Sequence, residues 1–172
     1  TGWEPPSALL SPAHGGAMAY LQAVALAFVA IAAGAGLAVK FQIGEPWWWV
    51  MPDGRLCIHD DAASAALGDP GEQNMLGAPD TEVLDAAGEL LAASTLALRD
   101  AVEGAAAEAE VLLLAYLPTV LDAAMPELRR ANLPLGWAWP AFDVLQLEDY
   151  AWAVAGNAAA NERAVAEVEA RL

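Results

Sequence analysis

The sequence predicts an α/β fold with parallel strands, and two observations lead to this prediction. Helical patterns alternate with short apolar stretches, in the order helix, strand, helix, strand, helix, strand, helix. In addition, residues 111–117 form a continuous apolar run, which is typical of a parallel strand buried on both faces. The chain has 172 residues, enough for one domain with a hydrophobic core. Because it opens without Met and stops inside a predicted helix, we expect a portion of a longer protein.

The first predicted element is a helix over Gly15–Ala33, which begins after Ser11-Pro12-Ala13-His14. No charged residue occurs from 15 to 39, a length that could span a bilayer. The stretch is rich in Ala and Gly, which favour membrane insertion less than Leu, Ile or Phe, and it has no basic flank. We therefore expect a helix lying on the sheet, with a membrane span as the alternative. The upstream Trp3-Glu4-Pro5-Pro6 is expected to be an irregular loop.

The first strand is predicted over Leu37–Ile43, where β-branched and aromatic residues alternate. Gly44, Glu45 and Pro46 end the strand pattern, and three tryptophans follow. Residues 50–79 are then expected to be an insertion that shapes a site. Within it we predict a hairpin turn at Asp53-Gly54 with arms at 50–51 and 56–58, a short helix over 62–67 capped by Asp60 or Asp61, and a loop over 68–79.

The rest of the chain continues the alternation of helices and strands. A long amphipathic helix is predicted from Asp80 to about Gly104. The elements expected after it are a strand over Val111–Leu117, a helix over Leu121–Ala131, a strand over Phe142–Leu147 and a last helix over Asn157–Leu172. The pattern of Leu135–Pro140 fits either a loop or a short strand.

Each predicted strand has polar or aromatic residues at its carboxyl end, which is where the active site of a (β/α)₈ barrel lies. No Gly-rich phosphate turn follows any strand, so we predict no nucleotide cofactor. A whole barrel needs about 250 residues. Three clear βα units therefore indicate an incomplete portion of a TIM barrel, forming a single fragment over residues 1–172.

Composition narrows the range of partners. The formal net charge is −16, from 23 acidic and 7 basic residues, which argues against binding nucleic acid or an anionic membrane surface. Cys57 is the only cysteine, so no internal disulfide can form. His14 and His59 lie far apart in the sequence, and we expect no metal site.

Glu45 and Glu148 are the candidate catalytic residues, because each directly follows an apolar strand and precedes aromatic residues. A glutamic acid in such a setting can protonate a glycosidic oxygen, and aromatic faces stack on sugar rings. We expect both carboxyl groups to face one pocket. The candidate ligand-binding residues are Trp47, Trp48, Trp49, Tyr116, Asp149, Tyr150 and Trp152. The alternative is a Trp-rich corner that packs under a loop, with Glu45 merely solvated.

The run Gly44-Glu45-Pro46 resembles the Asn-Glu-Pro motif of retaining glycoside hydrolases of the large barrel clan. This resemblance implies that Glu45 is the acid/base and Glu148 the nucleophile. Two departures weaken it. Gly44 replaces the Asn that contacts the sugar in that clan, and Glu148 follows the second strand after Glu45, not the third, unless 135–139 is a strand.

A closer resemblance is carried by the runs Phe41–Trp49 and Phe142–Tyr150. They are similar to the barrel domain of the non-contractile tail sheath proteins of phages and gene transfer agents, from Pro6 to about Gly156. Ala151 stands where members of that family usually have Asp. The resemblance implies a virion component made in the bacterial cytoplasm, with a glycosidase-like barrel. Its implied partners are other tail subunits and a surface polysaccharide.

Three functions of different class are therefore open. The first is a virion component whose barrel serves as structure or binds surface glycans. The second is an active retaining glycoside hydrolase that uses Glu45 and Glu148. The third is a cytosolic α/β domain without a site in this region. We favour the first, because Gly44 replaces the sugar-contacting Asn and the strand count is one short for the hydrolase.

Overall fold

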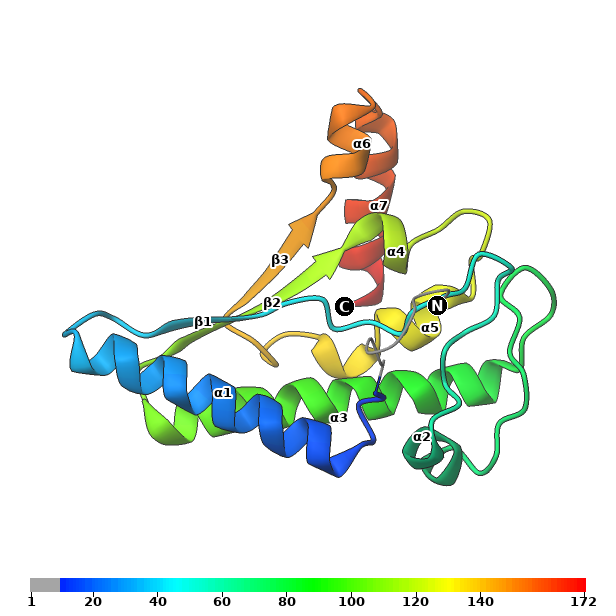
Figure 1. The fold of residues 1–172 in the computed structure, drawn as a ribbon. Helices are drawn as coiled ribbons and strands as arrows, with labels where there is room; N and C mark the ends of the chain where they lie inside the picture. Colours follow the sequence, from blue (N-terminus) through cyan, green and yellow to red (C-terminus); the bar gives the residue numbers. More distant parts are fainter. Residues whose placement is uncertain (1–9) are drawn as a thin grey trace.

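The computed structural model describes residues 10–172, so the loop predicted at Trp3–Pro6 lies outside the described residues. Three parallel strands form one sheet in the order β1-β2-β3, with bounds β1 (Lys40–Ile43), β2 (Glu110–Tyr116) and β3 (Val144–Glu148). Their carboxyl ends point toward the same edge of the sheet (Figure 1). The predicted parallel α/β fold is confirmed, and within residues 10–172 the sheet is open and has three strands.

Seven α-helices and one 3₁₀ turn accompany the sheet in the described part of the chain. They are α1 (Gly15–Gly34), α2 (Asp61–Ala66), α3 (Thr81–Ala105), α4 (Leu117–Val120), α5 (Leu128–Asn132), η1 (Leu135–Trp137), α6 (Tyr150–Val154) and α7 (Ala158–Arg171). The central helix is α3, which contacts α1, α5, η1, β1 and β2. Its N-cap is Asp80, as predicted, and its apolar stripe includes Leu84, Leu91, Leu98 and Val102.

The two faces of the sheet differ in polarity. One face carries Val111, Leu113 and Ala115 of β2, all buried, with Phe41, Ile43, Leu145 and Leu147 beside them in the core. On the other face Lys40 forms an ion pair with Glu110 at 2.7 Å, and the Gln42 amide donates to the Gln146 amide oxygen at 2.7 Å across β2. Because side chains alternate along a strand, the apolar set packs with the helices and the polar set meets solvent.

Several segments differ from the prediction, and one open alternative is decided. The helix predicted over 121–131 is present only as α5, because Pro126 lacks an N–H and excludes a continuous helix there, and α4 lies before the predicted range. Residues 135–137 form a 3₁₀ turn, so Glu148 remains at the end of the second strand after Glu45. The strands β1 and β3 are shorter than predicted, β2 is displaced by one residue, and α6 was not anticipated.

The first helix is confirmed, but its expected position on the sheet is wrong. It packs along α3 (Figure 1), and its buried residues are Ala25 and Val29. Large apolar side chains elsewhere on α1 are exposed, including Tyr20 at 69%, Phe28 at 61% and Ile31 at 69%. By length and composition alone α1 could cross a membrane. The lack of charge in α1 is therefore only partly explained by burial within the described residues.

The insertion over 50–79 contains the predicted hairpin and short helix, but the hairpin has less strand pairing than predicted. The hairpin is a single antiparallel bridge between Val50 and Leu56, with Gly54 at φ +89° in its turn. The short helix α2 is capped by Asp60, whose carboxylate accepts the Ala63 N–H at 2.7 Å.

Candidate functional site

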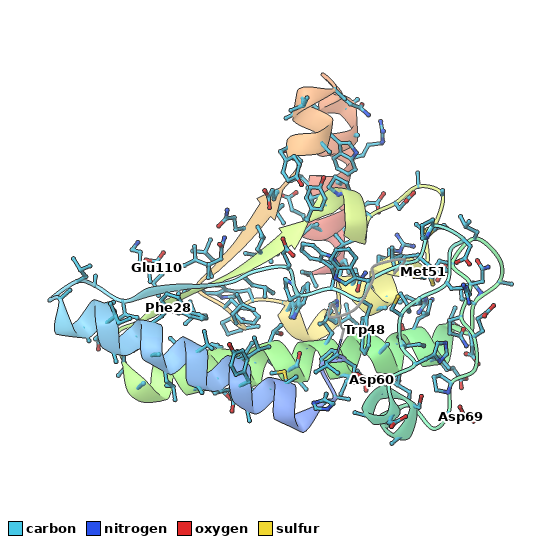
Figure 2. All side chains as sticks on the ribbon, in the orientation of Figure 1. Phe28, Trp48, Met51, Asp60, Asp69 and Glu110 are labelled. Carbon is cyan, nitrogen blue, oxygen red and sulfur yellow. The ribbon has the colours of Figure 1, made fainter. Side chains whose placement is uncertain are left out.

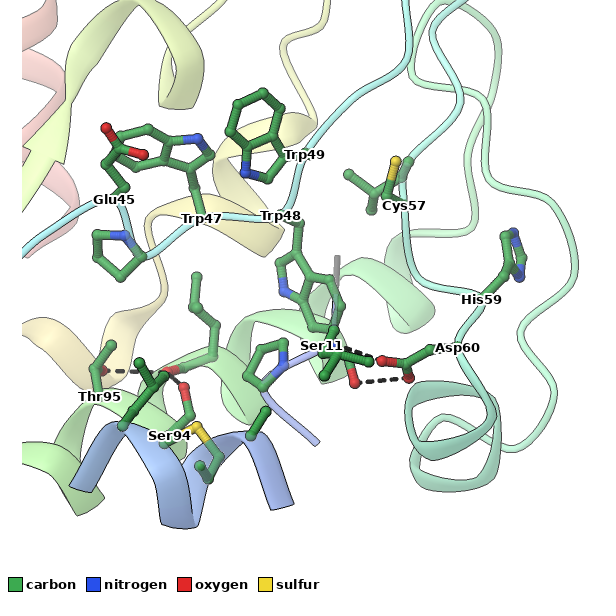
Figure 3. A pocket seen from close by; sticks show the side chains of 18 of the residues that line it. Ser11, Glu45, Trp47, Trp48, Trp49, Cys57, His59, Asp60, Ser94 and Thr95 are labelled. Atoms are coloured by element: carbon green, nitrogen blue, oxygen red, sulfur yellow. Dashed lines mark hydrogen bonds between the residues drawn. The ribbon is translucent and has the colours of Figure 1, made fainter. Parts of the chain in front are cut away.

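The corner after β1 directs the three tryptophans to different places. Glu45 adopts a left-handed backbone with φ 52°, a conformation that is uncommon for a residue with a side chain. The Trp47 N–H then donates to the Glu45 carbonyl at 3.0 Å, closing a tight turn. Figure 3 shows Trp47 and Trp49 on one side of the backbone and Trp48 on the opposite side.

Trp48 is a core residue and is 3% exposed. Its indole N–H donates to the Ala87 carbonyl of α3 at 3.0 Å. Its backbone is held by Asn132 of α5: the Trp48 N–H donates to the Asn132 side-chain oxygen at 2.7 Å, and the Asn132 amide donates to the Trp48 carbonyl at 3.0 Å. Trp48 lies between the strand corner and α3 (Figure 2), so its ring is committed to packing.

A cavity of about 530 Å³ lies beside this corner (Figure 3). It is bordered by α1, α3, the end of β1 and the start of the insertion, and its lining is mostly apolar. Glu45, Trp47 and Trp49 contribute to one wall, while Leu91 and Thr95 of α3 contribute to another. Ile43, which points to the helix side of the sheet, also lines it. The cavity therefore opens on the helix side of the sheet, next to β1.

Asp60 connects the insertion to the segment before α1. Its carboxylate caps α2 and also accepts the Ser11 hydroxyl at 2.8 Å and the Ser11 backbone N–H. Partial burial acts to raise the pKa of Asp60, but the hydrogen bonds from Ser11 and Ala63 outweigh it and hold that pKa below its ordinary value. The bonds from Ser11 fix the lower wall of the cavity (Figure 3).

A second group of predicted residues meets at the carboxyl edge of the sheet. The rings of Tyr116 and Tyr150 stack with centroids 4.9 Å apart and planes 18° apart, and the Trp47 ring lies 6.1 Å from Tyr116. Glu148 of β3 pairs in register with Tyr116 of β2. We call Trp47, Tyr116, Glu148 and Tyr150 the aromatic rim. Burial raises the pKa of Tyr116, and the hydrogen bond with Tyr150 and the charge of Glu148 act in the same direction.

The candidate site residues around Glu45 and Glu148 do not line one cavity together. Glu45, Trp47 and Trp48 line the 530 Å³ cavity, but Glu148, Tyr116 and Trp152 do not. Trp152 lines a different cavity, of about 420 Å³, between the α4–α5 connection and α7. Asp149 accepts a hydrogen bond from the Asn161 amide and so ties α6 to α7. In residues 10–172, no group of three His, Cys, Asp or Glu side chains is arranged to hold a metal ion.

Two buried polar residues that organise this region were not anticipated. They are Asn132 at the end of α5 and Thr95 in the middle of α3, and the sequence pattern assigns neither a role of its own. Thr95 accepts the Trp137 indole N–H at 2.9 Å and donates to carbonyls one turn earlier in α3. Nothing local in the sequence distinguishes these residues from exposed Asn or Thr, because both depend on partners more than 40 residues away.

Comparison with known proteins gives one match. The family model described as "Non-contractile tail sheath protein TIM barrel" matches residues 1–172. No curated protein and no solved structure matches the chain.

Proposed function

Because this chain belongs to the family of non-contractile tail sheath protein TIM barrels, we propose that it is a structural sector of a tail barrel, closed by further strands at both edges of its sheet. Membership makes the chain a component of a phage-like particle that assembles with other virion subunits. Within residues 10–172, neither the outer edge of β1 nor that of β3 is paired with another strand.

The observation that carries this proposal is the exposed apolar surface of α1 beside the outer edge of β1. The 530 Å³ cavity lies between α1, α3 and Ile43, where a further strand next to β1 would place its side chains. Parallel β–α–β connections are right-handed in nearly all proteins. A strand that precedes α1 would therefore pair with β1 and lie beneath α1, covering residues such as Phe28 and Leu21.

Hydroxyl-radical footprinting tests this proposal. Tyr20, Phe28 and Ile31 are expected to be modified readily in the isolated 172-residue chain and protected in the full-length protein, because a strand and its neighbours cover them there. Leu76 in the insertion, which is also exposed, provides the reference. Equal modification of the three α1 residues in both samples would contradict barrel closure at this edge.

The hydrolase alternative receives less support from the geometry. A retaining glycosidase needs two carboxyl groups about 5–5.5 Å apart across one sugar site. Of the two candidate glutamates, Glu45 lines the cavity beside the tryptophans and Glu148 does not, and Trp48, expected to stack on a sugar, is buried. The structural function is therefore the better supported one, and glycan binding would rest on the more exposed Trp49.

Turnover assays with the complete protein separate these functions. We expect no hydrolysis of aryl glycosides or bacterial surface polysaccharides by the wild type, Glu45→Gln or Glu148→Gln. Hydrolysis by the wild type that either substitution abolishes, with folding intact, would establish the enzyme. For glycan binding, Trp49→Ala is the appropriate variant, because Trp48→Ala would disturb the core.

A further inference from the structure

The aromatic rim combines ring faces with the Glu148 carboxylate, and Glu45 lies two residues before its Trp47. Among the described residues, neither Glu45 nor Glu148 forms an ion pair with a lysine or arginine. Basic side chains pair with carboxylates elsewhere, namely those of Lys40, Arg55, Arg99, Arg129 and Arg130. The negative charge at the rim is thus left unneutralised by this part of the chain.

The rings of the rim are placed to receive a cation. Tyr150 is 58% exposed and lies on Tyr116, and Trp47 extends the ring cluster toward Glu45. Cations are attracted to the faces of Trp and Tyr, and the attraction grows with a nearby carboxylate. The net charge of −16 adds a long-range field that draws basic partners and repels acidic ones.

We propose that the aromatic rim binds a lysine-bearing segment of another protein subunit. The ammonium group would lie against the Tyr150 ring with Glu148 beside it, while the aliphatic stem packs on Trp47. The observation that selects this partner is charge complementarity at an edge formed by all three strands, the edge at which barrel proteins bind their ligands. The inference rests on the proposed function in one respect only, namely that the lysine-bearing segment comes from another subunit of the tail.

Calorimetric titration of the full-length protein with a short lysine–glycine peptide tests this inference. Tyr150→Leu, which keeps bulk but removes the ring, and Glu148→Gln should each weaken binding roughly two- to fivefold. Glu108→Gln is the matched control: it removes the same charge from an exposed turn before the amino end of β2, and it should leave binding unchanged.

Several results would overturn the inference. Equal weakening by Glu108→Gln and Glu148→Gln would show attraction to net charge alone, and no measurable binding would exclude the site. Glucosamine oligomers bound more tightly than the peptide, with the same dependence on Tyr150 and Glu148, would replace the protein partner by a cationic sugar. Barrel closure is measured separately by footprinting of α1, so either idea can fail without the other.

Discussion

At the scale of single residues, the tryptophan run shows what sequence patterns can and cannot determine. The sequence located the corner after β1 and its aromatic character, since Gly44 and Pro46 end a strand by their backbone properties alone. It did not separate Trp48, which is buried, from Trp49, which is partly exposed, because that difference depends on α3 and on Asn132 of α5.

Asn132→Ala should lower the free energy of unfolding by about 2–4 kcal/mol. The substitution leaves the Trp48 N–H and carbonyl buried without partners, and each unsatisfied buried group costs about 1–3 kcal/mol. Urea unfolding followed by tryptophan fluorescence measures the change. Asn74→Ala, in the insertion, is the comparison and should cost less, because Asn74 is less buried. Equal losses would show that the Asn132 contacts contribute little.

Asp60 should make stability depend on pH in a defined direction. Because its pKa is lowered in the folded protein, the stability it contributes is present above its ordinary value of 3.8 and is lost as the pH falls further. Asp60→Ala should cost about 1 kcal/mol at neutral pH through the lost cap of α2. Thermal melts of both proteins should converge below pH 3.8. A gap that stays constant down to pH 2 would contradict this assignment.

At the scale of elements, prediction succeeded where a pattern is long and local. The helix α3 was located from its apolar spacing and its Asp80 cap, and β2 from its apolar run. The helix predicted over 121–131 is replaced by turns up to residue 127, because Pro126 cannot occupy a helix interior. The packing of α3 against α5 could not be foreseen, because it depends on one glycine in the middle of a helix.

Gly88→Ala should destabilise the fold by about 1–3 kcal/mol, as overpacking does. A Cβ at Gly88 would lie 2.3 Å from the Arg130 carbonyl oxygen, so α5 would have to move away from α3. Gly104→Ala in the same helix is the control. Its added Cβ would meet nothing within 4 Å, and it should stabilise the protein by up to about 1 kcal/mol. Chemical denaturation measures the free energy of unfolding of both variants. If the two substitutions changed it by a similar amount in the same direction, the close-packing argument would be refuted.

At the scale of the whole molecule, the sequence predicted a barrel portion, and the family match supports it. What it could not provide is the relation between the two glutamates. Both follow strands, but Glu45 adopts a left-handed backbone beyond the end of β1 and borders the 530 Å³ cavity, while Glu148 remains on its strand beside Tyr116. The left-handed backbone of Glu45, which a strand pattern does not predict, sets the direction in which its side chain leaves the corner.

The isolated chain should self-associate through the exposed apolar side chains of α1, because surfaces of this kind promote association. Phe28→Glu combined with Ile31→Glu should make it monomeric while circular dichroism stays unchanged. Sedimentation velocity gives the assembly state, and Glu substitutions at the exposed Ala107 and Ala159 provide a control of equal charge. The full-length protein should be soluble without detergent. Recovery of that protein only in an alkali-resistant membrane fraction would instead establish α1 as a membrane span.

During synthesis, α1 leaves the ribosome before the helix against which it packs. The packing partner of α1 is α3, which is complete only after residue 105. At about 5–20 residues per second, the ribosome needs roughly 4–14 seconds to proceed from the end of α1 to that point. During this interval an uncharged, twenty-residue apolar helix is available to any chaperone or targeting factor that recognises such segments. In the biogenesis of the tail protein, such factors therefore compete with α3 for α1, and α3 becomes available only after they do.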